Sequence, residues 1–106
     1  IYGDGSQTRS FCYVEDLVNG LIKLMNSNFI GPINIGNPNE FTIKELAEKI
    51  KGKINHNLKF TFQPLPEDDP IQRKPLIDLA KQHLDWKPNV ELDEGLDYTI
   101  NFMREI

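Results

Sequence analysis

The chain has 106 residues and a mass of 12.2 kDa, the size of one ordinary domain or of part of a larger one. Its net charge of −4 argues against nucleic-acid binding, which usually needs a basic face, but it leaves small anionic ligands open because one or two arginines can bind an anion locally. The single cysteine, Cys12, excludes an internal disulfide framework and a multi-cysteine zinc site, and no apolar run approaches the roughly 18 residues of a membrane span.

The first predicted element is a strand, loop and strand over residues 1–14. Apolar residues at both ends surround a polar centre, in which Gly3 and Gly5 flank Asp4 as a turn-forming cluster. Ile1 opens directly into the first strand, with neither an initiator methionine nor a signal peptide, so we expect the chain to be cut from a longer protein. A helix then opens at Glu15, because apolar residues recur at helical spacing up to about Asn26; this stripe comprises Leu17, Leu21, Leu24 and Met25.

The middle of the chain predicts a strand, helix and strand. Residues 32–36 alternate apolar and polar side chains, as do residues 58–62, and both read as short strands. Between them, Thr42 and Glu45 form a capping box, so a helix begins there. The three elements together predict a parallel pair of strands joined by a right-handed crossover.

The last third begins with a loop, since Pro64, Pro66 and Pro70 interrupt regular structure. Residues 77–84 predict a short helix, and another helix starts at or just before Asp93. The predicted fold class is therefore mixed α/β, with about four helices and short strands.

Common catalytic and metal-binding patterns are nearly absent. The sequence contains neither a G-x-G-x-x-G turn nor a G-x-x-x-x-G-K-[ST] phosphate loop. His56 and His83 have no partner at metal-ligand spacing and are expected at the surface, whereas Cys12 is expected to be a small buried hydrophobe. The acidic run at residues 67–69 could hold a hard metal ion, but a solvated loop is the commoner explanation.

Two arginines are candidates for binding an anion. Arg9 follows a Gly-rich segment that also offers Gln7 and Thr8, and Arg73 lies in the Pro-rich loop. A guanidinium forms a bidentate fork to a phosphate, so two such forks could hold a diphosphate. The composition alone favours the alternative that both are exposed, solubilising residues.

Longer motifs favour the anion-binding role. The run I-Y-G-D-G-S-Q-T-R-S-F-C-Y-V-E-D-L resembles the C-terminal part of extended short-chain dehydrogenases/reductases, the NAD-dependent epimerase/dehydratase family, that act on nucleotide sugars. Three more motifs follow in the family's order: G-P-I-N-I-G-N-P-N-E-F-T-I-K-E-L-A, D-D-P-I-Q-R-K-P and L-D-W-K-P. The run D-D-P-x-x-R-K-P is similar to the branch that decarboxylates UDP-glucuronate. The resemblance covers essentially residues 1–106, which it implies to be one C-terminal nucleotide-sugar-binding region.

This resemblance implies roles for four residues. Arg9 is expected to reach the diphosphate or the sugar, and Arg73 the diphosphate side. Tyr2 is expected beside the nucleoside, and Gln7 is a weaker polar candidate. The sequence departs from the family at Leu76, where Asp usually follows R-K-P, so the polar role at that position is either lost or taken by Asp78.

The resemblance also implies a cofactor and partners. Such enzymes oxidise carbon 4 of UDP-glucuronate with tightly held NAD, release carbon dioxide from the keto acid and return the hydride. In the family, the NAD-binding turn and the catalytic Tyr-x-x-x-Lys pair lie upstream of this region, and neither pattern occurs in this sequence. We therefore expect the chain alone to be catalytically silent, with no catalytic, cofactor-binding or metal-binding residue. A UDP-sugar is the expected ligand, in a homodimeric protein of the cytoplasm or, behind an upstream membrane anchor, of the Golgi lumen.

The sequence leaves two alternatives open. Within the same family, the chain could belong to a nucleotide-sugar 4-epimerase or 4,6-dehydratase. From a different class, it could be a non-catalytic domain for ligand binding or association. An upstream Gly-rich turn and a Tyr-x-x-x-Lys pair would discriminate the enzyme from the binding module.

Overall fold

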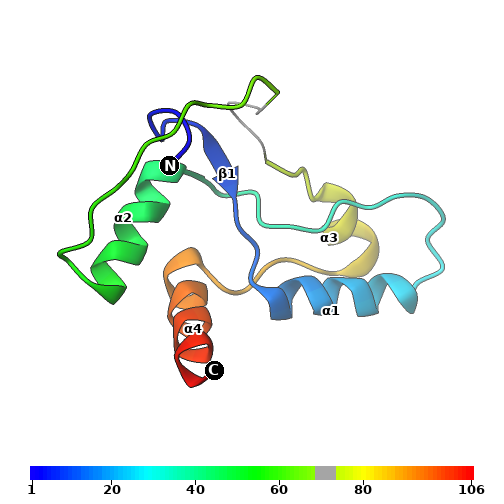
Figure 1. The fold of residues 1–106 in the computed structure, drawn as a ribbon. Coiled ribbons are helices and arrows are strands. Elements are labelled where there is room, and N and C mark those ends of the chain that lie inside the picture. Colours follow the sequence, from blue (N-terminus) through cyan, green and yellow to red (C-terminus); the bar gives the residue numbers. More distant parts are fainter. Residues whose placement is uncertain (69–73) are drawn as a thin grey trace. The chain divides into compact units, whose positions relative to one another are not determined.

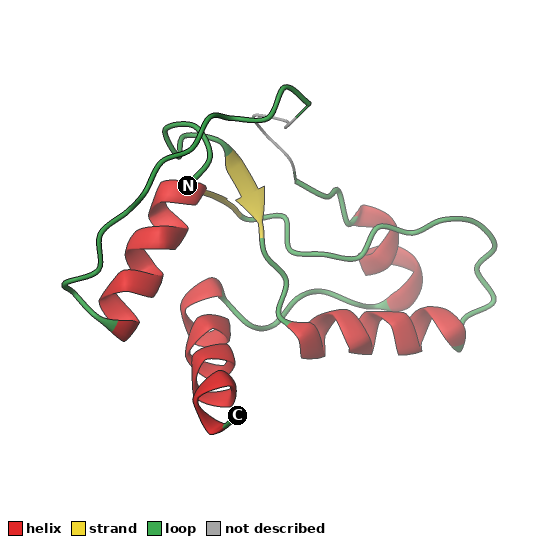
Figure 2. Cartoon of the chain, in the orientation of Figure 1, coloured by secondary structure: helices red, strands yellow, loops and turns green. Residues whose placement is uncertain are grey.

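The computed structural model describes residues 1–68 and 74–106 of the chain. Within them, four helices and two three-residue strands are joined by long irregular segments (Figures 1 and 2). This confirms the predicted mixed α/β class. The elements in chain order are β1 (Thr8–Ser10), α1 (Val14–Met25), β2 (Glu40–Thr42), α2 (Ile43–Ile54), α3 (Asp78–Leu84) and α4 (Leu92–Glu105).

The chain divides into two units. The first comprises Ile1–Arg9 and Glu40–Arg73, and the second comprises Ser10–Asn39 and Lys74–Ile106. In the first unit, β1 pairs with β2, and α2 follows β2 directly. The capping box that starts α2 is present as predicted: the Glu45 amide donates to Thr42 Oγ1 at 3.0 Å, and the Thr42 amide donates to Glu45 Oε1 at 3.2 Å.

The two strands predicted over residues 32–36 and 58–62, and the parallel crossover between them, are wrong. The sheet of the described residues pairs only β1 with β2, and one isolated parallel bridge, between Tyr2 and Gln63, lies just after the second segment. Alternation of apolar and polar residues is a condition for a strand, but a strand forms only where a neighbour pairs with its backbone groups. Here the Gln63 amide donates to Ile1 O and Gln63 O accepts from the Gly3 amide, both at 2.7 Å. Within the second segment, Thr61 O accepts from the Ile1 amino group at 2.7 Å, and these few bonds do not make a strand.

The boundary of the first helix also differs from the expectation. The second predicted strand was placed over Phe11–Val14, whereas β1 ends at Ser10 and α1 already begins at Val14. The helix ends at Met25 with Asn26 as its C-cap, as the sequence predicts. The helices α3 and α4 likewise begin within one residue of their predicted starts.

The core of the second unit is small. Four buried apolar residues form it, and partly buried ones surround it: Ile77, Ala80, Leu84 and Trp86, then Cys12, Leu24, Ile33 and Ile35. The helices α1 and α3 lie side by side across this core (Figure 1). The core thus consists mainly of α3, the turn after it and the inner face of α1.

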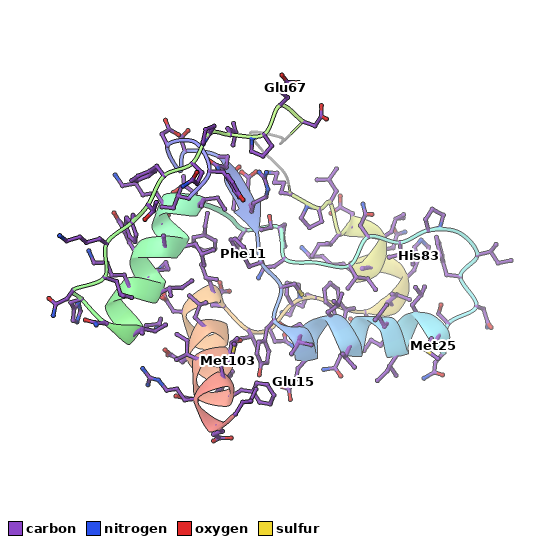
Figure 3. The ribbon with its side chains drawn as sticks, in the orientation of Figure 1. Phe11, Glu15, Met25, Glu67, His83 and Met103 are labelled. Atoms are coloured by element: carbon purple, nitrogen blue, oxygen red, sulfur yellow. The ribbon has the colours of Figure 1, made fainter. Side chains whose placement is uncertain are left out.

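The inner face of α1 is not its apolar stripe. Asp16 and Gly20 are buried and Leu24 is half-buried, at the i, i+4 and i+8 positions that share one side of a helix. The predicted stripe residues Leu17, Leu21 and Met25 are 37%, 47% and 82% exposed. Figure 3 shows Met25 at the end of the helix, away from the core. Of the predicted stripe, only Leu24 therefore lies on the inner face, and the other three residues remain uncovered in this chain.

Gly20 allows α1 to approach the core closely, so Gly20→Ala is expected to destabilise the second unit. A Cβ there would lie 2.7 Å from Ile35 Cγ2, closer than real contacts allow, and 3.1 Å from Trp86 Cε2, which is tighter than most. Overpacking costs about 1–3 kcal/mol, which exceeds the gain in helix propensity. The free energy of unfolding, measured with urea, should fall accordingly.

Gly52→Ala is the matched control, because Gly52 also lies inside a helix but its Cβ would meet nothing within 4 Å. This substitution should raise stability by up to about 1 kcal/mol through helix propensity. Equal effects of the two substitutions would contradict the close packing of α1 at Gly20.

Candidate functional site

The candidate ligand-binding segment begins with a tight loop in the first unit. Gly3 and Gly5 have φ values of 68° and 82°, which glycine adopts without strain. The Ser6 amide donates to Asp4 Oδ1 at 2.9 Å, and the hydrogen bonds from Ser6 lower the pKa of the Asp4 carboxyl. Gly5 O accepts from the Lys44 amide at 3.0 Å, so the loop is fixed to the first turn of α2.

These glycines do not fit a dinucleotide. In a dinucleotide-binding turn, a Gly-rich loop opens a helix whose free amides face the pyrophosphate. Here the Gly-rich loop leads into the strand β1 instead. The first amides of α2 are occupied as well, because those of Ile43 and Lys44 donate to Gln7 O and Gly5 O. This Gly-rich loop therefore does not have the form of a dinucleotide-binding turn.

Gln7 is buried, with only 5% of its surface exposed. Its Nε2 donates to Tyr2 O at 2.8 Å and its backbone O accepts from the Ile43 amide at 2.9 Å. The side chain thus closes the loop of residues 2–7 on itself. A direct contact from Gln7 to a ligand stays a prediction, and the structure gives this side chain a positioning role for Tyr2.

Tyr2 and Arg9 lie at the two ends of this loop. The Tyr2 side chain is 58% exposed, so its ring is accessible for stacking. Arg9 is half-buried in β1, and its Nη1 donates to Thr8 O at 2.6 Å. The structure therefore brings Tyr2, Gln7 and Arg9 into one short segment of one unit. The fourth candidate, Arg73, lies outside the described residues.

The sequence offers Thr8 beside Arg9 but does not show that its hydroxyl is buried. Thr8 Oγ1 is buried and has no hydrogen-bond partner among the described residues, and the same holds for Ser10 Oγ. Buried polar atoms are usually satisfied, so each exception calls for an explanation. The signal in the sequence was the position of Thr8 within the T-R-S run of the motif.

Sequence reasoning also gave Asp16 no role beyond opening a helix. It is 3% exposed, and its Oδ2 accepts from the Asn89 and Val90 amides at 3.0 and 2.9 Å. Its backbone O accepts from Trp86 Nε1 at 3.0 Å. Asp16 therefore ties the start of α1 to the segment before α4. The sequence holds no local signal for these bonds, because Asp16 and its partners lie far apart along the chain.

The histidines and the acidic loop remain surface features. His56 and His83 are exposed as expected, and His83 stacks on Phe29 with ring centroids 4.6 Å apart. Glu67 projects from the tip of its loop in Figure 3, and the neighbouring Asp68 is exposed too. Asp69 lies outside the described residues. Residues 1–68 and 74–106 contain no cluster of three or more potential metal ligands.

Leu76, Asp78 and Cys12 are the remaining candidates from the sequence. Leu76 is 70% exposed, and its backbone O accepts from Asn34 Nδ2 at 3.4 Å. Asp78 is exposed in the first turn of α3. Cys12 is half-buried against the core, and burial raises the pKa of its thiol, which fits a packing residue rather than a nucleophile. No helix among the described residues has the length and apolar character to cross a membrane.

Comparisons with known proteins identify relatives over the whole chain. The chain is 52% identical over 107 residues to UDP-glucuronic acid decarboxylase 1 of Danio rerio, and 50% identical over 104 residues to UDP-glucuronic acid decarboxylase 1 of Arabidopsis thaliana. These matches cover 100% and 98% of this chain but only 26% and 24% of the relatives. The chain therefore spans about a quarter of the length of the curated relatives it matches.

A solved structure supports the fold. It is the crystal structure of UDP-glucuronic acid 4-epimerase from Bacillus cereus in complex with UDP-glucuronic acid and NAD. The match covers 99% of this chain and 34% of the epimerase chain, with a TM-score of 0.88 and 28% sequence identity. Residues 1–36 match the family described as NAD dependent epimerase/dehydratase family. These matches confirm the resemblance drawn from the motifs: the chain is similar, over essentially its whole length, to a segment of the UDP-glucuronic acid decarboxylases, and its first 36 residues match the model of the NAD dependent epimerase/dehydratase family.

Proposed function

We propose that this chain is the C-terminal nucleotide-sugar-binding part of a UDP-glucuronate decarboxylase, which converts UDP-glucuronate to UDP-xylose. The observation that carries the proposal is identity of about half of all residues over the whole chain with proteins of that name. The D-D-P-x-x-R-K-P run supports the decarboxylase over other members of the family.

In this proposal the chain binds and orients the substrate. Arg9 and Arg73 bind the diphosphate, because a guanidinium keeps its charge at any working pH and matches a phosphate with two parallel hydrogen bonds. Tyr2 lies against the nucleoside, and its exposed ring agrees with that role. Gln7 acts through Tyr2, since its amide holds the Tyr2 carbonyl. The cofactor NAD is held by the part of the relatives that this chain does not cover, and the chain alone is catalytically silent.

The uncovered apolar face of α1 supports the proposal that this chain is part of a larger protein. Five of its apolar side chains are between 37% and 82% exposed: Val14, Leu17, Val18, Leu21 and Met25. Monomeric proteins rarely leave such a contiguous apolar surface in water. We propose that a further part of the protein covers this face, and that the whole protein is a homodimer of the cytoplasm or of the Golgi lumen.

A segment exchange tests the proposed function. Residues 1–106 replace the corresponding segment of the Arabidopsis relative, and the hybrid is assayed for carbon dioxide released from UDP-glucuronate. We expect turnover within about tenfold of the unaltered enzyme, because about half of the segment is already identical. The isolated chain should release none.

The matched control is a hybrid with the segment of the Danio rerio relative. If that hybrid is active while the one with residues 1–106 is folded but inactive, the proposed function is wrong. The runner-up is a UDP-glucuronic acid 4-epimerase, which the solved Bacillus cereus structure favours at 28% identity. Recovery of activity only when residues 1–106 are placed in that epimerase, with the C4-epimer as product, would establish the runner-up.

A further inference from the structure

The second unit contains a cavity of about 640 Å³ that the proposed function does not use. Its walls are one side of α1 from Asp16 to Lys23, one side of α3 and the segment that follows α3. All of its lining residues belong to this one unit. Tyr2, Gln7 and Arg9 belong to the other unit, so the cavity is not formed by the residues assigned to the UDP-sugar.

Three lysines from three different segments line this cavity. They are Lys23 of α1, Lys81 of α3 and Lys87 of the following turn. Lys23 Nζ donates to Asp85 O at 2.9 Å, which holds its ammonium group at the cavity. The chain as a whole carries a net charge of −4, so a group of three cations differs in sign from the charge of the whole chain. Lysine ammonium groups bind phosphate as point charges.

Two carboxylates at the cavity oppose these three cations. Asp16 lines it, and its Oδ2 also accepts hydrogen bonds from the Asn89 and Val90 amides. The remaining carboxylate belongs to Asp85, which is exposed and has a left-handed backbone with φ 49°. The three ammonium groups therefore exceed the available negative charge.

The cavity also has an apolar wall. Ile22, which is 49% exposed, and Trp86 both line it. The indole is fixed, because its Nε1 donates to Asp16 O at 3.0 Å. A volume of this size suits a small organic molecule and exceeds what a bare phosphate ion fills. We propose that this cavity binds a phosphorylated small molecule, with its phosphate among Lys23, Lys81 and Lys87 and its organic part against Ile22 and Trp86.

The single tryptophan of the chain makes the test local. The indole N–H of Trp86 gives one cross-peak in a ¹H–¹⁵N NMR spectrum, which is followed while the chain is titrated with ribose 5-phosphate, inorganic phosphate or succinate. We expect a saturable shift with both phosphate probes, tighter for ribose 5-phosphate, and weaker binding of succinate. No saturable shift with either phosphate probe would overturn the proposal, and succinate binding as tightly as ribose 5-phosphate would overturn the preference for phosphate.

Two variants with opposite expected effects distinguish phosphate binding at this cavity from non-specific attraction to positive charge. The double variant Lys81→Gln, Lys87→Gln should weaken ribose 5-phosphate binding about tenfold. Asp85→Asn should tighten it about twofold, since asparagine tolerates the left-handed backbone and removes the opposing charge. The control Lys59→Gln removes an exposed lysine of the other unit and should change nothing. The unliganded position of the indole cross-peak verifies folding in each variant, and unaltered affinity in the double variant would overturn the proposal.

Discussion

Replacing Asp16 by alanine is expected to lower the free energy of unfolding of the second unit by about 3–5 kcal/mol, a larger loss than Gly20→Ala should cause. The carboxylate is 3% exposed and accepts two backbone hydrogen bonds, from Asn89 and Val90. Each hydrogen bond to a charged group contributes about 1.5–3 kcal/mol, and its loss leaves a partly buried amide without a partner. Urea unfolding followed by Trp86 fluorescence measures the effect.

Glu15→Ala is the matched control for this substitution. Glu15 is the neighbouring acid in the first turn of α1 and contributes to the same helix dipole, but its side chain is exposed. It should lower stability by at most about 1 kcal/mol. Asp16→Asn should fall between the two, because the amide keeps an acceptor oxygen but loses the charge. If Asp16→Ala and Glu15→Ala cost the same, Asp16 acts through the dipole alone and its long-range bonds contribute nothing.

Arg9→Ala is expected to weaken binding of UDP by about one to two orders of magnitude in the active hybrid protein. One charge-assisted contact to the diphosphate would be lost, and its contribution of about 1.5–3 kcal/mol corresponds to that range. Turnover should fall as well if Arg9 orients the sugar, since small misplacements of a substrate are costly. Direct titration with UDP measures the first effect, and steady-state kinetics with UDP-glucuronate measures the second.

Two further variants identify the cause of that loss. Arg9→Lys should restore binding only in part, because a point charge cannot reproduce the planar fork. Arg104→Ala removes an exposed arginine from the end of α4 and should leave UDP binding unchanged. Arg73→Ala should mainly raise the apparent KM, because a diphosphate contact is equally strong before and during the reaction. Undiminished UDP affinity in both Arg9→Ala and Arg73→Ala would show that these arginines are surface charges.

The helices could be predicted because their signals are local. The Thr42 and Glu45 capping box lies within one turn of α2, so four consecutive residues contain the whole interaction. The ends of α1 and α3 likewise follow from residues next to them. The candidate site segment was found from its motif, which is also local in sequence, and the structure adds that Gln7 closes the loop at Tyr2.

The tertiary structure alone decided the strands and the faces of the helices. Alternation at residues 32–36 and 58–62 fits a strand, yet neither segment pairs into a sheet, and the isolated bridge at Gln63 lies just after the second segment, because pairing depends on chain that is distant in sequence. The apolar stripe of α1 predicted a buried face, but the helix packs through Asp16 and Gly20, since the polar bonds of Asp16 and the small size of Gly20 allow the closest approach to Trp86. The sequence by itself thus determined the helices and the resemblance to the UDP-glucuronic acid decarboxylases, whereas long-range backbone pairing and side-chain volume decided which surfaces this chain buries and which it leaves exposed.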